Sequence, residues 1–157
     1  MTTIKYIDGD ATEPVGDGKK LIPHVCNDCG GWGAGFVLAI SKKWPQVEGE
    51  YRKWYKTGKN FKLGHIQGVK VTDDIAIINM IGQHDTRSHN GVPPVRYGAI
   101  RICLQKVSEL ALKHKASIHA PKFGSDLAGG SWNEIEKIIN EELCAKDIDV
   151  TIYNWKG

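Results

Sequence analysis

The feature that most constrains this chain is the alternation of short β-like runs with longer segments of helical periodicity. The expected strands are 4–7, 21–26, 63–71, 75–81, 117–120 and 148–153, and the expected helices are 36–43, 46–55, 95–115 and one that begins at Ser131. Ser131 and Glu134 have capping-box spacing, so we expect the Ser131 hydroxyl to cap that last helix. The alternation predicts an α/β fold, a three-layer α/β/α sandwich with a mixed central sheet.

Length and composition limit the classes of protein further. A chain of 157 residues without internal repeats predicts a single domain over residues 1–157. The apolar runs are far shorter than the roughly 20 residues needed to cross a bilayer, and the first residues contain no export signal, so a cytoplasmic location without a membrane partner is expected. The net charge of +3 is too balanced for a dedicated nucleic-acid binder.

The four cysteines leave several interpretations open. Cys26 and Cys29 have C-x-x-C spacing, whereas Cys103 and Cys144 each stand alone. A zinc site needs a second pair of ligands, and a redox pair would lie at a helix start after a strand, roughly where this pair falls. Reduced thiols in a cytoplasmic protein are the simplest interpretation. We therefore expect neither a metal nor a cofactor.

Two glycine-rich loops are the strongest functional signal. The first covers 27–35, between a predicted strand and a predicted helix, and the second covers 121–130 in the same kind of position. Unhindered backbone N–H groups at a helix N-terminus bind anions well. Neither loop has the P-loop or dinucleotide-binding pattern. Both should lie at the carboxyl edge of the sheet, where together they could grip a diphosphate from two sides. The alternative for either loop alone is a turn that merely allows tight packing.

These loops carry a resemblance to a known family. Asp10 after the first strand, the Asn27 loop with Gly33-Ala34-Gly35, the segment 123–132 and Tyr153 resemble a macro domain over residues 4–154. The stretch 24–36, and Ile81-Gly82-Gln83-His84 followed by Arg96-Tyr97, are most similar to the branch with ADP-ribose-1″-phosphate phosphatases and terminal ADP-ribose protein glycohydrolases.

The resemblance implies a pocket for ADP-ribose. Asp10 would accept the adenine amino group beside the Ala11 backbone, Asn27 would face the distal ribose, and Tyr153 would lie near the adenosine. Residues 33–36 and 124–127 would wrap the diphosphate. Trp32, which lies on no periodic face, is expected to be a flap over the ligand. The implied ligand-binding residues are Asp10, Ala11, Asn27, Trp32, Gly33, Ala34, Gly35, Phe36, Phe123, Gly124, Ser125, Leu127 and Tyr153.

Catalytic residues are also implied by the resemblance. His24 and Asp126 are similar to catalytic positions of the phosphatase branch, and an imidazole suits acid–base work near neutral pH. The alternatives are a satisfied buried histidine and a loop-capping carboxylate. His84, Asp85 and His89, in the long loop 82–94, are further candidates.

The sequence departs from the related glycohydrolases at three places. The lysine-dependent enzymes place a nucleophilic lysine where this chain has Met80-Ile81-Gly82-Gln83, and their catalytic aspartate falls on Ala128. A lysyl intermediate is therefore not expected. Asp126 occupies a usual glycine position, where a carboxylate near a diphosphate is unfavourable unless it points toward the distal ribose or is protonated.

The expected function is binding of ADP-ribose with hydrolysis of ADP-ribose-1″-phosphate to ADP-ribose and phosphate. Alternatives are release of ADP-ribose from modified proteins or nucleic-acid ends, and an ADP-ribose reader without turnover. A nucleic-acid-binding domain is a third class, for which the basic residues would be Lys42, Lys43, Arg52, Lys53 and Lys56. Such charges are more often found on solvated helix faces.

Overall fold

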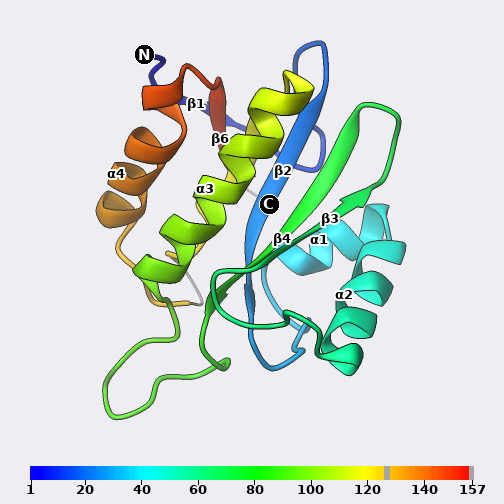
Figure 1. Cartoon of the computed structure of the whole chain (residues 1–157), viewed down its shortest axis with the longest axis vertical. Helices are drawn as coiled ribbons and strands as arrows, with labels where there is room; N and C mark the ends of the chain where they lie inside the picture. The colour runs from blue at the N-terminus through cyan, green and yellow to red at the C-terminus, as the bar shows by residue number, and fades with distance from the viewer. Residues whose placement is uncertain (126–127, 156–157) are drawn as a thin grey trace.

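A six-stranded mixed sheet forms the centre of the molecule (Figure 1). The computed structural model describes residues 1–125 and 128–155. The strand order is β1-β6-β5-β2-β4-β3, and all neighbours are parallel except β3 and β4. The strands are β1 (Lys5–Asp8), β2 (Lys20–Asn27), β3 (Ile66–Lys70), β4 (Ile75–Gln83), β5 (Ser117–Pro121) and β6 (Val150–Asn154).

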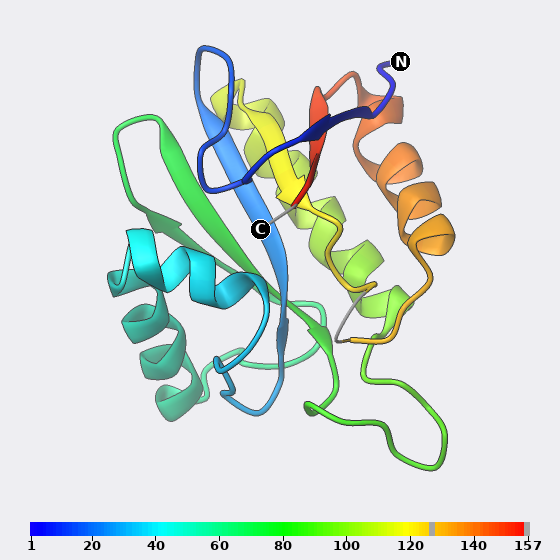
Figure 2. The same ribbon diagram turned by 180° about the vertical axis from the view of Figure 1, so that it is seen from behind.

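Helices cover both faces of this sheet. They are α1 (Phe36–Lys43), α2 (Gln46–Thr57), α3 (Tyr97–His114) and α4 (Trp132–Glu142), followed by a short 3₁₀ turn, Cys144–Lys146. Figures 1 and 2 show α3 and α4 on one face and α1 and α2 on the other. The prediction of a three-layer α/β/α fold with a mixed sheet is confirmed.

The two-residue period of the strands divides the apolar side chains between two cores. Leu21 and Ile78 join the core under α3 and α4, whereas their neighbours Ile22 and Ile77 join the core under α1 and α2. Because β2 and β4 are apolar on both faces, they belong at the centre of the sheet, where helices cover each side. His24 lies on the α1–α2 face of β2, two residues after Ile22.

Apart from shifts of one or two residues at the ends of elements, the sequence predictions fail at three local points. Strand β3 begins at Ile66 rather than at residue 63, because residues 62–65 form a turn in which His65 N–H donates to the Lys62 carbonyl at 3.1 Å. The 3₁₀ turn after α4 was not predicted. The capping box is wrong: Ser131 occupies the N-cap, but its side chain makes no capping hydrogen bond. Instead its own N–H donates to the Tyr97 hydroxyl at 2.8 Å.

The topology brings the loops after β2 and β5 together. Strand β2 lies between β5 and β4, so the chain leaves β2 toward one side of the sheet and later returns to its other side. Such a switch point leaves a crevice at the carboxyl ends of the strands. Figures 1 and 2 show the chain segments that follow β2, β4 and β5 at one end of the molecule. Within the described ranges, none of the helices has the length and apolar character required of a membrane span.

Candidate functional site

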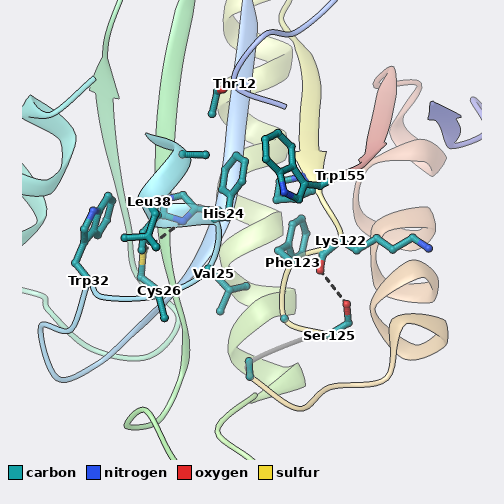
Figure 3. Close-up of a pocket in the computed structure, with 18 of the residues that line it drawn as sticks. Thr12, His24, Val25, Cys26, Trp32, Leu38, Lys122, Phe123, Ser125 and Trp155 are labelled. Carbon is teal, nitrogen blue, oxygen red and sulfur yellow. Dashed lines mark hydrogen bonds between the residues drawn. The ribbon is translucent and has the colours of Figure 1, made fainter. Parts of the chain in front are cut away.

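A large open cleft lies at this end of the sheet, between the two glycine-rich loops. Its volume is about 1630 Å³, and both 31–36 and 121–125 line it. Figure 3 shows Trp32, His24 and Leu38 on one side of the cleft and Phe123, Ser125 and Trp155 on the other. Ligand pockets in proteins usually measure about 300–1000 Å³, so the space suffices for a dinucleotide-sized ligand.

Most of the sequence-predicted site residues meet in this cleft. Those that line it are Asp10, His24, Asn27, Trp32, Gly33, Ala34, Gly35, Phe36, Phe123, Gly124, Ser125 and Tyr153. Ala11 is buried beside Asp10 and does not line the cleft. Asp126 and Leu127 lie outside the described residues.

Sequence reasoning missed several lining residues. Lys42 and Lys43 on α1 line the cleft and bring positive charge to it, whereas Lys122 after β5 lines it but directs its ammonium group away, over the ring of Tyr6 (Figure 3). Trp155 is 60% exposed and lies at the end of β6, at the mouth of the cleft. An aromatic side chain that remains exposed beside a cleft is an unusual placement. The sequence position of Trp155, just beyond the last predicted strand, could have indicated that it lies at the cleft, because the carboxyl ends of parallel strands share one edge of the sheet.

The first glycine loop, which lines the cleft, has main-chain N–H groups without acceptors among the described residues. Helix α1 starts at Phe36, and no side chain caps its N-terminus. No acceptor among the described residues takes a hydrogen bond from the N–H groups of 33–36. Unpaired donors at the positive end of a helix favour an anionic ligand.

The Asn27 side chain holds the shape of this loop. Its Oδ1 accepts N–H hydrogen bonds from Cys29 at 3.1 Å and Gly31 at 2.9 Å, and its Nδ2 donates to the Gly31 carbonyl at 2.9 Å. The Tyr51 hydroxyl of α2 lies 2.7 Å from the Asn27 carbonyl oxygen and 3.0 Å from Oδ1. The amide thus bonds the loop and Tyr51 of α2, although the residue also lines the cleft.

Removing the Tyr51 hydroxyl is therefore expected to destabilise the protein. In Tyr51→Phe the Asn27 carbonyl, which is buried, loses its donor, so the free energy of unfolding should fall by about 1–2 kcal/mol. Urea unfolding followed by circular dichroism measures this change. Tyr55→Phe is the matched control, because no described residue bonds the hydroxyl of this half-exposed side chain. Equal stability of the two variants would contradict the assignment.

His24 is a buried, neutral histidine at the floor of the cleft. It is 2% exposed, and burial lowers its pKa to about 4, although the hydrogen bond to Asn79 opposes this shift. Its Nε2 lies 2.5 Å from Asn79 Oδ1, and Asn79 Nδ2 donates to Gln67 Oε1 at 2.9 Å. Since Asn79 presents its oxygen, Nε2 carries the hydrogen and Nδ1 keeps the lone pair. The ring can therefore accept a proton but does not supply one at neutral pH.

Trp32 is part of the core, and the expectation of a flap is wrong. Its side chain is 4% exposed and packs against Tyr51 with ring centroids 5.1 Å apart. The indole N–H donates to Ser41 Oγ of α1 at 2.7 Å. A buried indole is stable only with such a partner, and this hydrogen bond anchors the loop rather than leaving it open.

Tyr153 is buried as well, and its hydroxyl supports the opposite wall. It accepts the Val15 N–H at 2.9 Å and lies 2.7 Å from His119 Nδ1. The pKa of His119 is lowered to about 4 by burial, with a smaller contribution from the charge of Lys20.

Asp10 has one carboxylate oxygen engaged and one available. Its Oδ1 accepts both the N–H and the hydroxyl of Thr12, at 2.8 and 2.7 Å, which leaves Oδ2 free of described partners.

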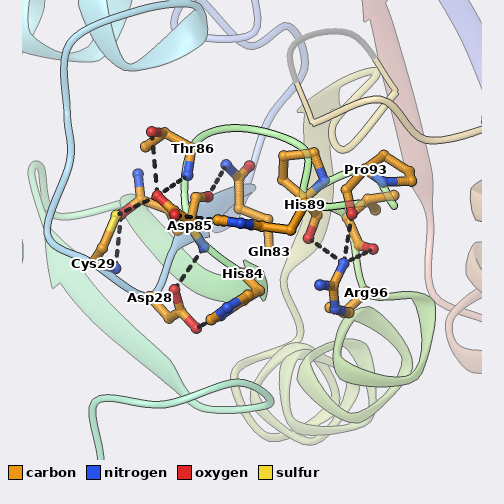
Figure 4. Close-up of polar contacts among 12 residues, drawn as sticks. Asp28, Cys29, Gln83, His84, Asp85, Thr86, His89, Pro93 and Arg96 are labelled. Atoms are coloured by element: carbon orange, nitrogen blue, oxygen red, sulfur yellow. Dashed lines mark hydrogen bonds and ion pairs between the residues drawn. The ribbon is translucent and has the colours of Figure 1, made fainter. Parts of the chain in front are cut away.

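The alternative residues of the long loop form a separate polar cluster (Figure 4). His84 Nδ1 donates to Asp28 at 2.7 Å, and His89 Nε2 donates to Asp85 at 2.7 Å. Asp28 also accepts the Asp85 N–H at 2.8 Å. None of His84, Asp85 and His89 lines the cleft, so this cluster ties the loop after β4 to the loop after β2.

Neither the cysteines nor the basic residues considered for nucleic acid form a separate site among the described residues. All four cysteines are free thiols, and Cys29 alone is exposed. Among residues 1–125 and 128–155, no three histidine, cysteine or acidic side chains are grouped as a metal site. Of the basic residues considered for nucleic acid, Lys43 donates to the Thr12 carbonyl at 2.6 Å and Arg52 pairs with Glu48 at 2.8 Å.

Comparison with known proteins identifies the fold and the family. No protein-family model matches the chain. A Bacteroides thetaiotaomicron protein of unknown function is 52% identical, with a TM-score of 0.96 over 97% of this chain and 98% of that one. A macrodomain protein from Streptomyces coelicolor is 46% identical, with a TM-score of 0.85 over 96% of this chain and 98% of that one.

Curated relatives are more distant. An ADP-ribose 1″-phosphate phosphatase from Candida albicans is 28% identical over 88% of this chain and 92% of its own length. Chromodomain-helicase-DNA-binding protein 1-like is 29% identical in Danio rerio and 30% in Mus musculus, over 99% and 97% of this chain. This chain spans only 16% and 18% of those relatives. The fold, the two-loop cleft and the 46% identity to a macrodomain over nearly the full length of both chains together show that the chain belongs to the macrodomain family.

Proposed function

We propose that this macrodomain binds ADP-ribose in the cleft between its two glycine-rich loops. The observation that carries the proposal is that two glycine-rich loops far apart in the sequence, after β2 and after β5, line one cleft. N–H groups at the start of α1 suit a diphosphate. The name of the Candida albicans relative supports a ligand of this class.

The remaining residues fit the two ends of such a ligand. The free Oδ2 of Asp10 is a suitable acceptor for the exocyclic amine of adenine, and the buried Tyr153 shapes the wall beside it. The loop held by Asn27 would face the distal ribose. Lys42 and Lys43 line the cleft and would supply positive charge toward the diphosphate.

Isothermal titration calorimetry with ADP-ribose tests this binding. We expect one site with a dissociation constant in the micromolar range, which corresponds to about 8 kcal/mol of binding free energy. AMP and ribose 5-phosphate, which each represent a part of the ligand, should bind more weakly. Absence of heat at millimolar ADP-ribose would contradict the proposal.

Trp155 offers an optical signal for the same event. Because it is 60% exposed at the mouth of the cleft, a bound ligand should cover the indole and change its fluorescence. Titration with ADP-ribose should quench or shift the emission of the wild type, and Trp155→Leu should lose most of that response. Trp44, which is buried at the C-terminal end of α1 and does not line the cleft, should contribute a constant background. A full response in Trp155→Leu would place the ligand elsewhere.

For the reaction, we propose hydrolysis of ADP-ribose-1″-phosphate: water attacks phosphorus and the bond between phosphorus and the 1″ oxygen of the ribose breaks. That oxygen takes up the proton that the water loses, so ADP-ribose and inorganic phosphate are the products. His24 would accept the proton of the water at Nδ1, the nitrogen that keeps its lone pair. Asp126 would act near the distal ribose. The relative named ADP-ribose 1″-phosphate phosphatase, 28% identical over most of both chains, supports this choice.

Phosphate release from ADP-ribose-1″-phosphate tests the reaction. His24→Ala and Asp126→Ala should each reduce turnover at least about a hundredfold, as expected for loss of a general acid–base group. His114→Ala, on the exposed last turn of α3, is the matched control. Wild-type turnover in both site variants would overturn the assignment of these two residues.

A reader without turnover is the second candidate function. It is favoured by the buried, hydrogen-bonded state of His24, whose pKa of about 4 makes the imidazole a weak base. The assay separates the two functions: ADP-ribose binding without phosphate release, and without ADP-ribose release from modified protein or nucleic acid, would identify a reader.

A further inference from the structure

A network of hydrogen bonds between side chains of α1 and α2 contacts the first glycine loop at two of its residues, Gly30 and Trp32. Trp32 Nε1–H donates to Ser41 Oγ of α1 at 2.7 Å. Ser41 in turn donates to Glu48 Oε1 of α2 at 3.1 Å, and Arg52 Nε donates to Glu48 Oε2 at 2.8 Å. Arg52 Nη1 then donates to the Gly30 carbonyl at 3.0 Å. The chain of hydrogen bonds thus begins at Trp32 and ends at Gly30, two residues apart in the same loop.

The backbone at Gly30 explains why this carbonyl can face Arg52. Gly30 has a φ of +79°, and a Cβ at this position would lie 2.5 Å from Cδ2 of the Tyr55 ring. Only glycine fits the left-handed backbone against that ring. Helix α2 therefore contacts the loop through Tyr55, Arg52 and Tyr51, which lie close together on one side of the helix.

We propose that Arg52 and Glu48 are positioning residues that set the geometry of the first glycine loop for the diphosphate. This inference rests on the proposed function, because it assigns the ligand that the loop serves. Neither residue lines the cleft, so each acts through Gly30 and Trp32 rather than on the ligand.

The type of side chain matters at position 52. Arg52 uses two separate N–H groups of its planar guanidinium, one toward Glu48 and one toward Gly30. A lysine carries the same charge on a single nitrogen and does not reproduce this fork. The pair is partly exposed, so its ion pairing alone contributes little to stability. Loss of binding without loss of stability would therefore mark a positioning role.

Four variants test this role: Arg52→Gln, Arg52→Lys, Glu48→Gln and the control Lys53→Gln, which removes a charge from the neighbouring exposed residue. Calorimetry with ADP-ribose should show roughly five- to tenfold weaker binding for both Arg52 variants and a smaller loss for Glu48→Gln. Lys53→Gln should stay within about twofold, and all melting temperatures within about 3 °C of wild type. Wild-type affinity in Arg52→Lys, or an equal loss in Lys53→Gln, would overturn the proposal in favour of a general charge effect.

A ligand-free measurement separates this inference from the proposed function. The indole N–H resonance of Trp32 in a ¹H–¹⁵N spectrum reports its hydrogen bond to Ser41. It should shift in Arg52→Gln and Glu48→Gln and stay constant in Lys53→Gln. If the wild type does not bind ADP-ribose, the proposed function fails, and a shifted Trp32 signal still supports the network. An unchanged Trp32 signal in both variants would overturn the network itself.

Discussion

Acidification from pH 7 to pH 4.5 is expected to remove several kcal/mol of stability from this protein. His24 and His119 are both buried, and burial lowers the pKa of each from 6.5 to about 4. Below pH 6.5 the unfolded chain therefore binds protons that the folded protein excludes. The stabilisation is complete above pH 6.5 and is lost as the pH falls toward 4. His24 alone accounts for about 3 kcal/mol, and His119 adds to the loss with the same sign.

Chemical unfolding at pH 7, 6, 5 and 4.5, followed by circular dichroism, measures this loss. The expected loss is a large fraction of the 5–15 kcal/mol that is the typical free energy of unfolding of a domain. His24→Gln should show a shallower pH dependence, because glutamine does not titrate and its amide can still donate to Asn79. A free energy of unfolding that stays constant within about 1 kcal/mol down to pH 4.5 would show that these histidines are not held neutral.

Substitution of Gly130 is expected to have the second large effect. A Cβ at Gly130 would overlap the carbonyl oxygen of Gly124, to which the Gly130 N–H also donates at 2.9 Å. The obstacle is backbone, so no rotamer change relieves it. Gly130→Ala must therefore open the second glycine loop, and we expect a destabilisation of about 2–3 kcal/mol together with the loss of most ADP-ribose affinity.

The control for this variant is Gly98→Ala, at an exposed position in the first turn of α3 with open space around its added Cβ. It should keep ADP-ribose affinity and either maintain or slightly raise stability, because alanine favours the helix. Differential scanning calorimetry and a binding titration on the same samples compare the two. Equal behaviour of Gly130→Ala and Gly98→Ala would mean that the loop tolerates a side chain.

The order and type of the elements could be predicted from the sequence because local patterns determine them. The apolar run 75–81 and the spacing of Ile100, Leu104 and Val107 are typical of a buried strand and an amphipathic helix, and both were found. The shared edge of the two glycine loops also followed, because a parallel strand directs its following loop to the carboxyl end.

The polar contacts inside the site could not be predicted in the same way. The partners of Asn27, His24 and Trp32 are Tyr51, Asn79 and Ser41, which come from other elements, and their meeting depends on tertiary packing. Trp32 lies in a glycine-rich loop and shows no helical or strand period, so its burial against α2 has no local signature. The failed cap at Ser131 has the same origin, since Tyr97 of another helix bonds the N-cap residue.

A crystal structure of the protein soaked with ADP-ribose tests the central claim most directly. The diphosphate should lie within hydrogen-bonding distance of main-chain N–H groups from both 33–36 and 123–125, with adenine toward Asp10. A diphosphate that contacts neither loop, or that contacts one of them while the other binds no part of the ligand, would contradict the account.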